Sequence, residues 1–210
     1  LIELQLPKGA ASLESTKTIA EAAKRGASLV SQLLSFATQN GPSKQITNLG
    51  KMITDSQELY RSLLGKRIEL RCSVSQYCAD ATLDPSQVQQ VITNLLANAK
   101  DAIGKRDDGV VVLSVSTVRL RAGEIDPELS PGNYLRVDVK DNGIGMDSEQ
   151  QARCFEPFYT TKNVDRGTGV GLNGSGLGLS AAYSIVKQHG GSLTVNSVVD
   201  EGATFSLYLP

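Results

Sequence analysis

One segment, residues 84–103, most constrains how this chain can fold. It opens with an Asp-Pro pair, a common helix start, and apolar side chains follow at helical spacing. The residues on that face are Val88, Val91, Ile92, Leu95, Leu96 and Ala99. A helix with one wide apolar face must bury that face against other elements, so the sequence predicts a core helix here.

The segments around this helix alternate between helical and strand patterns. A helix fits residues 49–64, where Gly65 ends it, and alternating apolar residues then predict a strand at 68–74. The remaining expected elements are strands at 110–120, 134–141, 192–198 and 203–210, and helices at 148–155 and 177–188. This mixture predicts an α+β fold, a two-layer sandwich with helices on one face of a mixed sheet.

The N-terminal part has a different pattern. From residue 12 to residue 39, apolar or small residues recur at helical spacing, which predicts one long amphipathic helix. Asn-Gly-Pro at 40–42 ends it, because proline cannot continue a helix. We expect a partial helical hairpin at 1–41 that precedes the α+β domain at 42–210.

Composition excludes several functional classes. The chain has 210 residues, a formal net charge of -1 and no basic block, which argues against nucleic acid as the main partner. No apolar run approaches the roughly 20 residues that cross a bilayer. We expect a cytoplasmic fragment without membrane contact, whose parent protein can still be membrane-anchored. The three cysteines fit no metal-ligand spacing and are expected to be reduced.

Four motifs follow one another: NLLANAKDA from Asn94, DNGIGM from Asp141, FEPFYTTK from Phe155 and GSGLGL from Gly174. Asn94 and Asn98 share one helix face, where an amide oxygen can ligate a hard cation such as Mg²⁺. Alternatively, the two amides form hydrogen bonds within the helix–sheet interface.

The two glycine motifs also have alternative interpretations. In DNGIGM, Asp141 ends a strand and can accept a hydrogen bond from an exocyclic amine such as that of adenine, but Asn-Gly is also a strong hairpin signal. In GSGLGL, backbone N–H groups and a helix N-terminus can bind phosphate, although glycines also occur where backbones pack closely.

The order and spacing of the motifs resemble the N, G1, F and G2 boxes of the GHKL (Bergerat) ATP-binding fold. The resemblance is to the catalytic and ATP-binding domain of bacterial sensor histidine kinases, and it covers about residues 48–210. The stretches LDPSQVQQVITNLLANAKDAI and SAAYSIVKQHGGSLTV also look like that family. Residues 21–37 are similar to the second helix of its dimerisation and phosphoacceptor hairpin.

The resemblance implies ATP and Mg²⁺ as cofactors. Asn98 would hold the metal with Asn94 assisting, Asp141 would accept the adenine amino group, and Lys162 would reach the terminal phosphates; Asn94, Asn98 and Lys162 are the expected catalytic residues. The other expected nucleotide-binding residues are Asp101, Gly143, Ile144, Gly145, Met146, Gly174, Ser175, Gly176, Leu177, Gly178 and Leu179. Asp101 stands where many histidine kinases have lysine. Phe155 and Phe158 are expected as hydrophobic anchors of the lid over the site, or as plain core residues.

Position 94 separates two chemistries. The related chaperone, gyrase and mismatch-repair ATPases have a glutamate there that activates water as a general base. Because Asn94 cannot accept a proton at neutral pH, the resemblance implies a protein histidine kinase of a two-component system. It would transfer the terminal phosphoryl group of ATP to a histidine upstream of this chain.

The implied partners are a cognate response regulator or receiver domain and, in the parent kinase, a second copy. The alternative is a degenerate module that docks a response regulator or phosphotransfer protein without ATP. The intact Asn98, Asp141 and G2 glycines argue against this alternative.

Two features remain. The single histidine, His189, is expected to have a structural capping role or to lie on the surface, because the family has HGG there without using it as acceptor. The glycine stretch is doubled, as GTGVGLN and then GSGLGLS at 167–180. The second copy leads directly into a helix, so we expect this copy to bind phosphate. Residues 167–173 are then expected to be additional residues within the lid loop.

Overall fold

The computed structural model describes residues 42–75, 78–161 and 176–210. The expected hairpin lies outside these residues, so the hairpin and the division at residue 41 stay predictions. The main sheet is built from β2 (Ile68–Val74), β4 (Gly109–Leu120), β5 (Gly132–Asp141), β6 (Ser192–Val198) and β7 (Gly202–Leu209). Its strand order is β2-β4-β5-β7-β6, with β2 parallel to β4 and the other neighbours antiparallel. The mixed sheet is confirmed.

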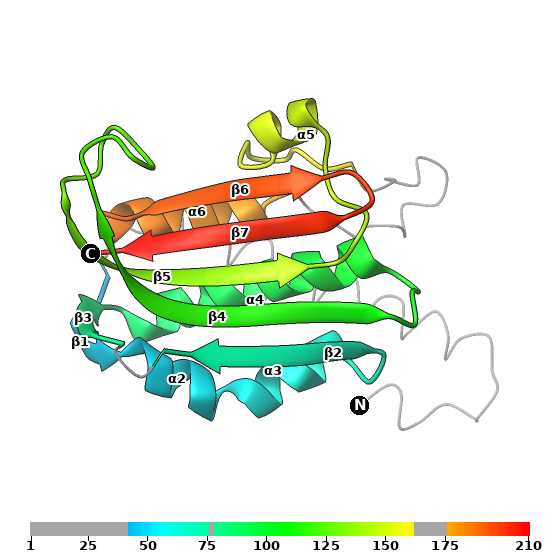
Figure 1. Cartoon of the computed structure of the whole chain (residues 1–210), viewed down its shortest axis with the longest axis horizontal. Helices are drawn as coiled ribbons and strands as arrows, with labels where there is room; N and C mark the ends of the chain where they lie inside the picture. The colour runs from blue at the N-terminus through cyan, green and yellow to red at the C-terminus, as the bar shows by residue number, and fades with distance from the viewer. Residues whose placement is uncertain (1–41, 76–77, 162–175) are drawn as a thin grey trace, which may run out of the picture. The chain divides into compact units, whose positions relative to one another are not determined.

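The helices are α2 (Leu49–Asp55), α3 (Gln57–Leu64), α4 (Pro85–Ile103), α5 (Ser148–Arg153) and α6 (Gly178–Gln188). Helices α4 and α6 lie side by side behind the strands in Figure 1, and α3 packs against α4 and β2. The helices α4 and α6 therefore form the second layer of the expected sandwich.

The core lies between these two layers. Every apolar residue expected on the face of α4 is buried, and Val111, Leu113 and Val115 of β4 face it with the same alternation that the sequence shows. The opposite face of the sheet has both polar and apolar parts: Arg136 is paired to Asp138 at 2.8 Å, and Leu120, Leu129, Tyr134 and Tyr208 form a second, smaller buried cluster. The buried core face fixes the register of the strands, because a slip of one residue would expose the core side chains.

Helix α4 begins where the sequence predicts. The buried Asp84 is its N-cap, and its Oδ1 accepts hydrogen bonds from the N–H groups of Ser86 (3.0 Å) and Gln87 (3.2 Å). The N–H of Asp84 in turn donates to Nε2 of His189 at 3.0 Å.

His189 is buried at the C-cap of α6, where its Nδ1 lies 2.8 Å from the carbonyl oxygen of Ile185. Because Nε2 accepts a hydrogen bond, Nδ1 carries the ring proton and donates it to that carbonyl. The structural role expected for His189 is confirmed: it joins the end of α6 to the start of α4.

Two local features differ from the sequence expectation. The helix expected at 49–64 is two helices, because Ser56 leaves helical geometry between α2 and α3, and its hydroxyl donates to Oε1 of Gln89 on α4 at 3.1 Å. A two-stranded antiparallel sheet of β1 (Gln45–Asn48) and β3 (Asp80–Leu83) has no counterpart in the sequence prediction.

Candidate nucleotide-binding site

Helix α4 carries the candidate site along its length. Near its middle, Nδ2 of Asn94 donates to the carbonyl oxygen of Gly178, the first residue of α6, at 3.1 Å. Near its end, the carbonyl of Ala102 accepts from the N–H of Ile144 at 3.1 Å. Eight residues separate these contacts, which is about 12 Å along the axis. The N box is thus joined to the G2 box at one end and to the G1 box at the other.

Asn98 lies between these two contacts. Its Nδ2 atom is buried and has no hydrogen-bond partner within the described part of the chain. A buried amide without a partner is costly in a folded protein, about 1–3 kcal/mol, so a bound group is its natural partner. Since the amide can rotate to present its oxygen instead, Asn98 fits the donor set that Mg²⁺ uses.

Asp141 is the last residue of β5 and is only 3% exposed. Burial raises the pKa of its carboxyl group, while hydrogen bonds from the N–H groups of Gly143 and Ala203 lower it. The Gly143 N–H donates to Oδ1 at 2.8 Å. A buried carboxylate held in this way can accept a hydrogen bond from an amine-bearing ligand.

The glycines after Asp141 allow the chain to pass close to its neighbours. A Cβ on Gly143 would lie 2.7 Å from the backbone carbon of Ala102, and one on Gly145 would lie 2.0 Å from the carbonyl oxygen of Val198. Gly145 also has a φ of +65°, which favours glycine. These positions shape the turn as the sequence predicts, through contacts with α4 and with the end of β6.

Two apolar residues of the turn differ in exposure. Ile144 exposes 60% of its surface, whereas Met146 is half-buried against the core. The N–H of Met146 donates to the hydroxyl of Ser197 at 2.8 Å, and that hydroxyl donates to the carbonyl of Gly202 at 2.7 Å. Ser197 therefore braces the turn against both β6 and β7.

The N-terminus of α6 is the expected phosphate cradle. No side chain caps it, and its first turn has no acidic residue. Its first N–H groups are therefore available to an anion, as at phosphate sites in other proteins. Among the described residues, a Cβ on Gly178 would meet no heavy atom within 4 Å, so this part of the chain leaves space beside the helix end. Leu177 is buried and Leu179 packs against the core, so the two leucines anchor the motif.

Gly176 is held against the F box. Its φ is +66°, a Cβ there would lie 2.5 Å from the backbone carbon of Phe158, and its carbonyl accepts from the N–H of Phe158 at 3.0 Å. Phe158 also has a positive φ of 66° and exposes 67% of its surface. The alternative that Phe158 is a plain core residue is therefore wrong, and its role as an anchor of the lid stays a prediction; in the described residues its backbone makes the connection to Gly176.

Phe155 packs against the core, which confirms the plain-core alternative for this residue. Its ring stacks on Tyr183 of α6 with centroids 5.3 Å apart, and it meets the Phe205 ring edge-on at 6.4 Å. The F box is thus joined to α6 and to β7 by aromatic contacts.

Four expected site residues remain. Asp101 is exposed near the end of α4. Lys162, Gly174 and Ser175 lie outside the described residues, as does the first glycine copy at 167–173, so their expected roles stay predictions.

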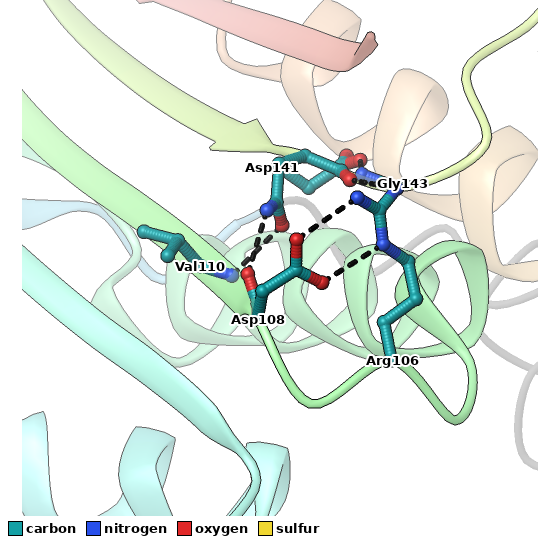
Figure 2. A network of polar contacts seen from close by, with 6 residues as sticks. Arg106, Asp108, Val110, Asp141 and Gly143 are labelled. Carbon is teal, nitrogen blue, oxygen red and sulfur yellow. Dashed lines mark hydrogen bonds and ion pairs between the residues drawn. The ribbon is translucent and has the colours of Figure 1, made fainter. Parts of the chain in front are cut away.

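Sequence reasoning missed two residues of the site. Gly202 has a φ of +102°, and a Cβ there would lie 2.1 Å from the carbonyl oxygen of Asp141. It stands in the turn Asp-Glu-Gly between the closing strands, where a glycine is an available signal for close approach. The second is Asn142, whose side chain joins β5 to β4. Figure 2 shows the polar network of Arg106, Asp108 and Val110 beside Asp141.

The fold and the site define an ATP-binding domain of the GHKL class. Residues 83–210 match the family described as histidine kinase-, DNA gyrase B-, and HSP90-like ATPase, and the chain belongs to this family. It is homologous to sensor histidine kinases and contains their type of ATP-binding catalytic domain.

Two curated relatives are similar over nearly the whole chain. The sensor kinase CckA of Brucella abortus is 34% identical over 194 residues, which are 91% of this chain and 20% of that protein. The sensor histidine kinase ZraS of Salmonella typhimurium is 31% identical over 205 residues, 97% of this chain and 39% of that protein. The chain therefore spans well under half the length of these relatives.

Solved structures agree on the fold. Full-length ShkA in complex with AMPPNP has a TM-score of 0.74 at 24% identity, and the match covers 99% of this chain and 41% of that one. The histidine kinase AdeS of Acinetobacter baumannii has a TM-score of 0.67 at 16% identity, over 99% of this chain and 90% of that one.

These findings confirm the resemblance and the fold class, and they give no support to the alternative of an ATP-independent docking module. In the ranges that the structure describes, no helix combines the length and apolarity that crossing a membrane requires.

Proposed function

We propose that this chain binds ATP with Mg²⁺ and donates its terminal phosphoryl group to a histidine upstream of the chain in the parent protein. In this step the bond from the terminal phosphorus to the bridging oxygen breaks, ADP leaves, and a phosphorus–nitrogen bond to the imidazole forms as the ring loses a proton. Catalysis of this kind rests on positioning and charge neutralisation.

One observation carries this proposal, the hydrogen bond from Asn94 to Gly178. A neutral amide is not basic enough to take a proton from water, and Asn94 instead donates its N–H to a carbonyl oxygen 3.1 Å away. The position that holds a general base in the related ATPases is therefore used as a structural link. Without a base, water is a poor nucleophile, and ATP is kept for an acceptor brought from outside.

Asn98 would hold the metal. Its amide is the buried group without a partner in the described part of the site, and an amide oxygen suits Mg²⁺. When bound, the metal supplies positive charge to the phosphates, which stabilises the charge that develops during phosphoryl transfer. Asp141 would orient the adenine end and the α6 N-terminus the phosphate end, so that α4 sets the distance between them.

The acceptor is proposed to come from another segment because of the position of His189. This histidine is the only one in the sequence, it is buried, and both of its ring nitrogens form hydrogen bonds. We also propose a response regulator or receiver domain as the next phosphoryl recipient, and a homodimer in the parent kinase. The resemblance of residues 21–37 to a dimerisation hairpin supports the dimer.

The test uses ATP labelled at the terminal phosphate. The chain alone should bind ATP but neither hydrolyse it rapidly nor become stably labelled, whereas a form extended upstream through the first hairpin helix should acquire an acid-labile label. The matched control is the extended form with Asn98→Ala, which should lose labelling. Rapid ATP hydrolysis by the chain alone, or a label on His189, would contradict the proposal.

A further inference from the structure

At the end of the pairing between β4 and β5, just after Asp141, a side-chain oxygen replaces a main-chain carbonyl as hydrogen-bond acceptor. β4 and β5 pair in register as far as Val111 and Asp141. At the next position the N–H of Asn142 donates to the carbonyl of Val110 at 3.3 Å. An antiparallel pair would return this bond from the Val110 N–H to the Asn142 carbonyl. Instead, the Val110 N–H donates to Oδ1 of Asn142 at 2.8 Å.

The other atoms of Asn142 bind the loop between α4 and β4. Nδ2 donates to the carbonyl of Asp108 at 2.8 Å, and the Asn142 carbonyl, released from the strand pairing, accepts from Nη1 of Arg106 at 3.2 Å. Arg106 is itself held by the carboxylate of Asp108 through two hydrogen bonds of 3.0 and 3.1 Å. Figure 2 shows this network beside Asp141. Asn142 thus has partners for its main chain and for both atoms of its amide.

The main chain leaves the strand pairing here because it must approach α4. Gly143 lies so close to Ala102 that a Cβ would be 2.7 Å away, and the Gly143 N–H donates to the carboxylate of Asp141. Asn142 is therefore the single residue between Asp141 and Gly143, which is one of the two residues, with Ala203, whose N–H groups bind its carboxylate. Fixing Asn142 to β4 fixes the end of β5 and the start of the turn together.

We infer that Asn142 is a positioning residue for adenine recognition, and that it acts through Asp141 with the Arg106–Asp108 pair in support. The inference rests on the proposed role of Asp141 as acceptor for the adenine amino group. Hydrogen bonds weaken steeply when distance or angle departs from the optimum, so a carboxylate that is free to shift discriminates less well. The amide of Asn142 is committed to Val110 and Asp108, so its effect is indirect.

The experiment measures discrimination rather than affinity alone. In the full chain with Mg²⁺, calorimetry compares ATP with purine riboside triphosphate, which lacks only the exocyclic amine. Asn142→Ala should lower ATP affinity by about fivefold, the size expected for a weakened hydrogen bond, and leave the affinity for the analogue unchanged. In a chain that already carries Asp141→Asn, the Asn142→Ala substitution should not lower ATP affinity further. The effects of two substitutions are not additive when the two residues act through the same contact. Amide hydrogen exchange at Val110 should rise in Asn142→Ala.

Two further variants keep the test decisive. Asn196→Ala, at an exposed asparagine of β6, is the matched control and should change neither affinity nor the ATP-to-analogue ratio. Arg106→Ala removes the hydrogen bond to the Asn142 carbonyl at the surface and should lower the ATP-to-analogue affinity ratio by about twofold. If Asn142→Ala does not fold, the affinity ratio of Arg106→Ala tests the inference in its place.

The outcomes separate the inference from the proposed function. An equal loss of affinity for both nucleotides, or an unchanged ratio, overturns the positioning role. If Asp141→Asn itself keeps the full preference for ATP, the proposed adenine contact fails, whatever Asn142 does.

Discussion

Replacing Gly178 by alanine should distinguish a glycine that the fold requires from a glycine that phosphate binding requires. The position is the first of α6, its φ lies outside the left-handed region, and a Cβ would meet no heavy atom of residues 42–75, 78–161 or 176–210 within 4 Å. Where the backbone already suits alanine, Gly→Ala stabilises a protein by about 0.4–1 kcal/mol, because the unfolded chain has less freedom to lose. We expect the free energy of unfolding without nucleotide to rise by about 0.5 kcal/mol.

With nucleotide present, Gly178→Ala should instead be less stable to unfolding than wild type. The added methyl group would occupy the open space beside the N–H groups of α6, where the phosphates are proposed to lie. We expect ATP affinity to fall at least tenfold, which is about 1.4 kcal/mol. At a ligand concentration of about 100 times Kd, wild type gains about 2.7 kcal/mol of stability from binding, so Gly178→Ala should lose about half of that gain. Urea unfolding with and without Mg²⁺-ATP, beside calorimetry, measures both quantities.

Gly176→Ala is the contrasting variant. Its φ of +66° and the Phe158 backbone 2.5 Å from a Cβ require glycine even without a ligand, so we expect a loss of about 2 kcal/mol of stability from the free chain. Loss of binding in this variant alone would not locate the phosphates. If Gly178→Ala keeps wild-type ATP affinity, or destabilises the free chain, the placement of the cradle is wrong. Deleting residues 167–173 should leave affinity within a few fold.

Four more outcomes follow from the structure. Burial raises the pKa of Asp141 above 3.8, so ATP affinity should fall as pH is lowered through the raised pKa, and Asp141→Asn should lack this dependence in calorimetry across pH. The stability of the nucleotide-free chain should depend on pH in the opposite direction. The folded state binds the Asp141 proton more tightly than the unfolded state, so unfolding should become easier as pH rises from 3.8 through the raised pKa. His189→Ala leaves the buried Asp84 N–H without its acceptor and should cost roughly 2–4 kcal/mol in urea unfolding, with ATP affinity nearly unchanged in calorimetry. Asn94→Glu should not create an efficient ATPase in a phosphate-release assay, because the new carboxylate would face the carbonyl of Gly178.

Helix α4 could be predicted almost to the residue, since two independent signals agree there. Its apolar spacing marks the face that the sheet covers, and Asp84 followed by Pro85 marks the start, where the structure shows both the cap and proline at the first position. Such signals are local, and they are strong because burial of one helix face depends on the helix period alone.

The β1–β3 pair could not be predicted because its signal is not local. Each strand has four residues, the partners lie about 35 positions apart, and Ile46 is 80% exposed, so no buried face imposes an alternating pattern. The break at Ser56 is similar. It coincides with a contact to Gln89 on a distant helix, and the apolar spacing of 49–64 runs through it without interruption.

Within the site, the motifs predicted which residues gather but not why each type is needed. Asn142-Gly143 is a strong hairpin signal, yet β5 continues into α5 instead of folding back. The asparagine extends the pairing with β4, and the glycine permits contact with Ala102. Both reasons depend on neighbours that only the folded chain brings together.

Asn94 shows how one position can join two properties that sequence reasoning treats separately. From the sequence it is a missing general base; in the structure its amide holds the first residue of α6, where phosphate is proposed to bind. An ionised glutamate could not donate that hydrogen bond and would repel the same carbonyl, so the start of α6 would have to move. Exchanging kinase for ATPase chemistry on this fold therefore requires a change in how α6 begins as well as a change at position 94. The absence of a base and the attachment of the proposed phosphate site at the start of α6 are thus two consequences of one side chain.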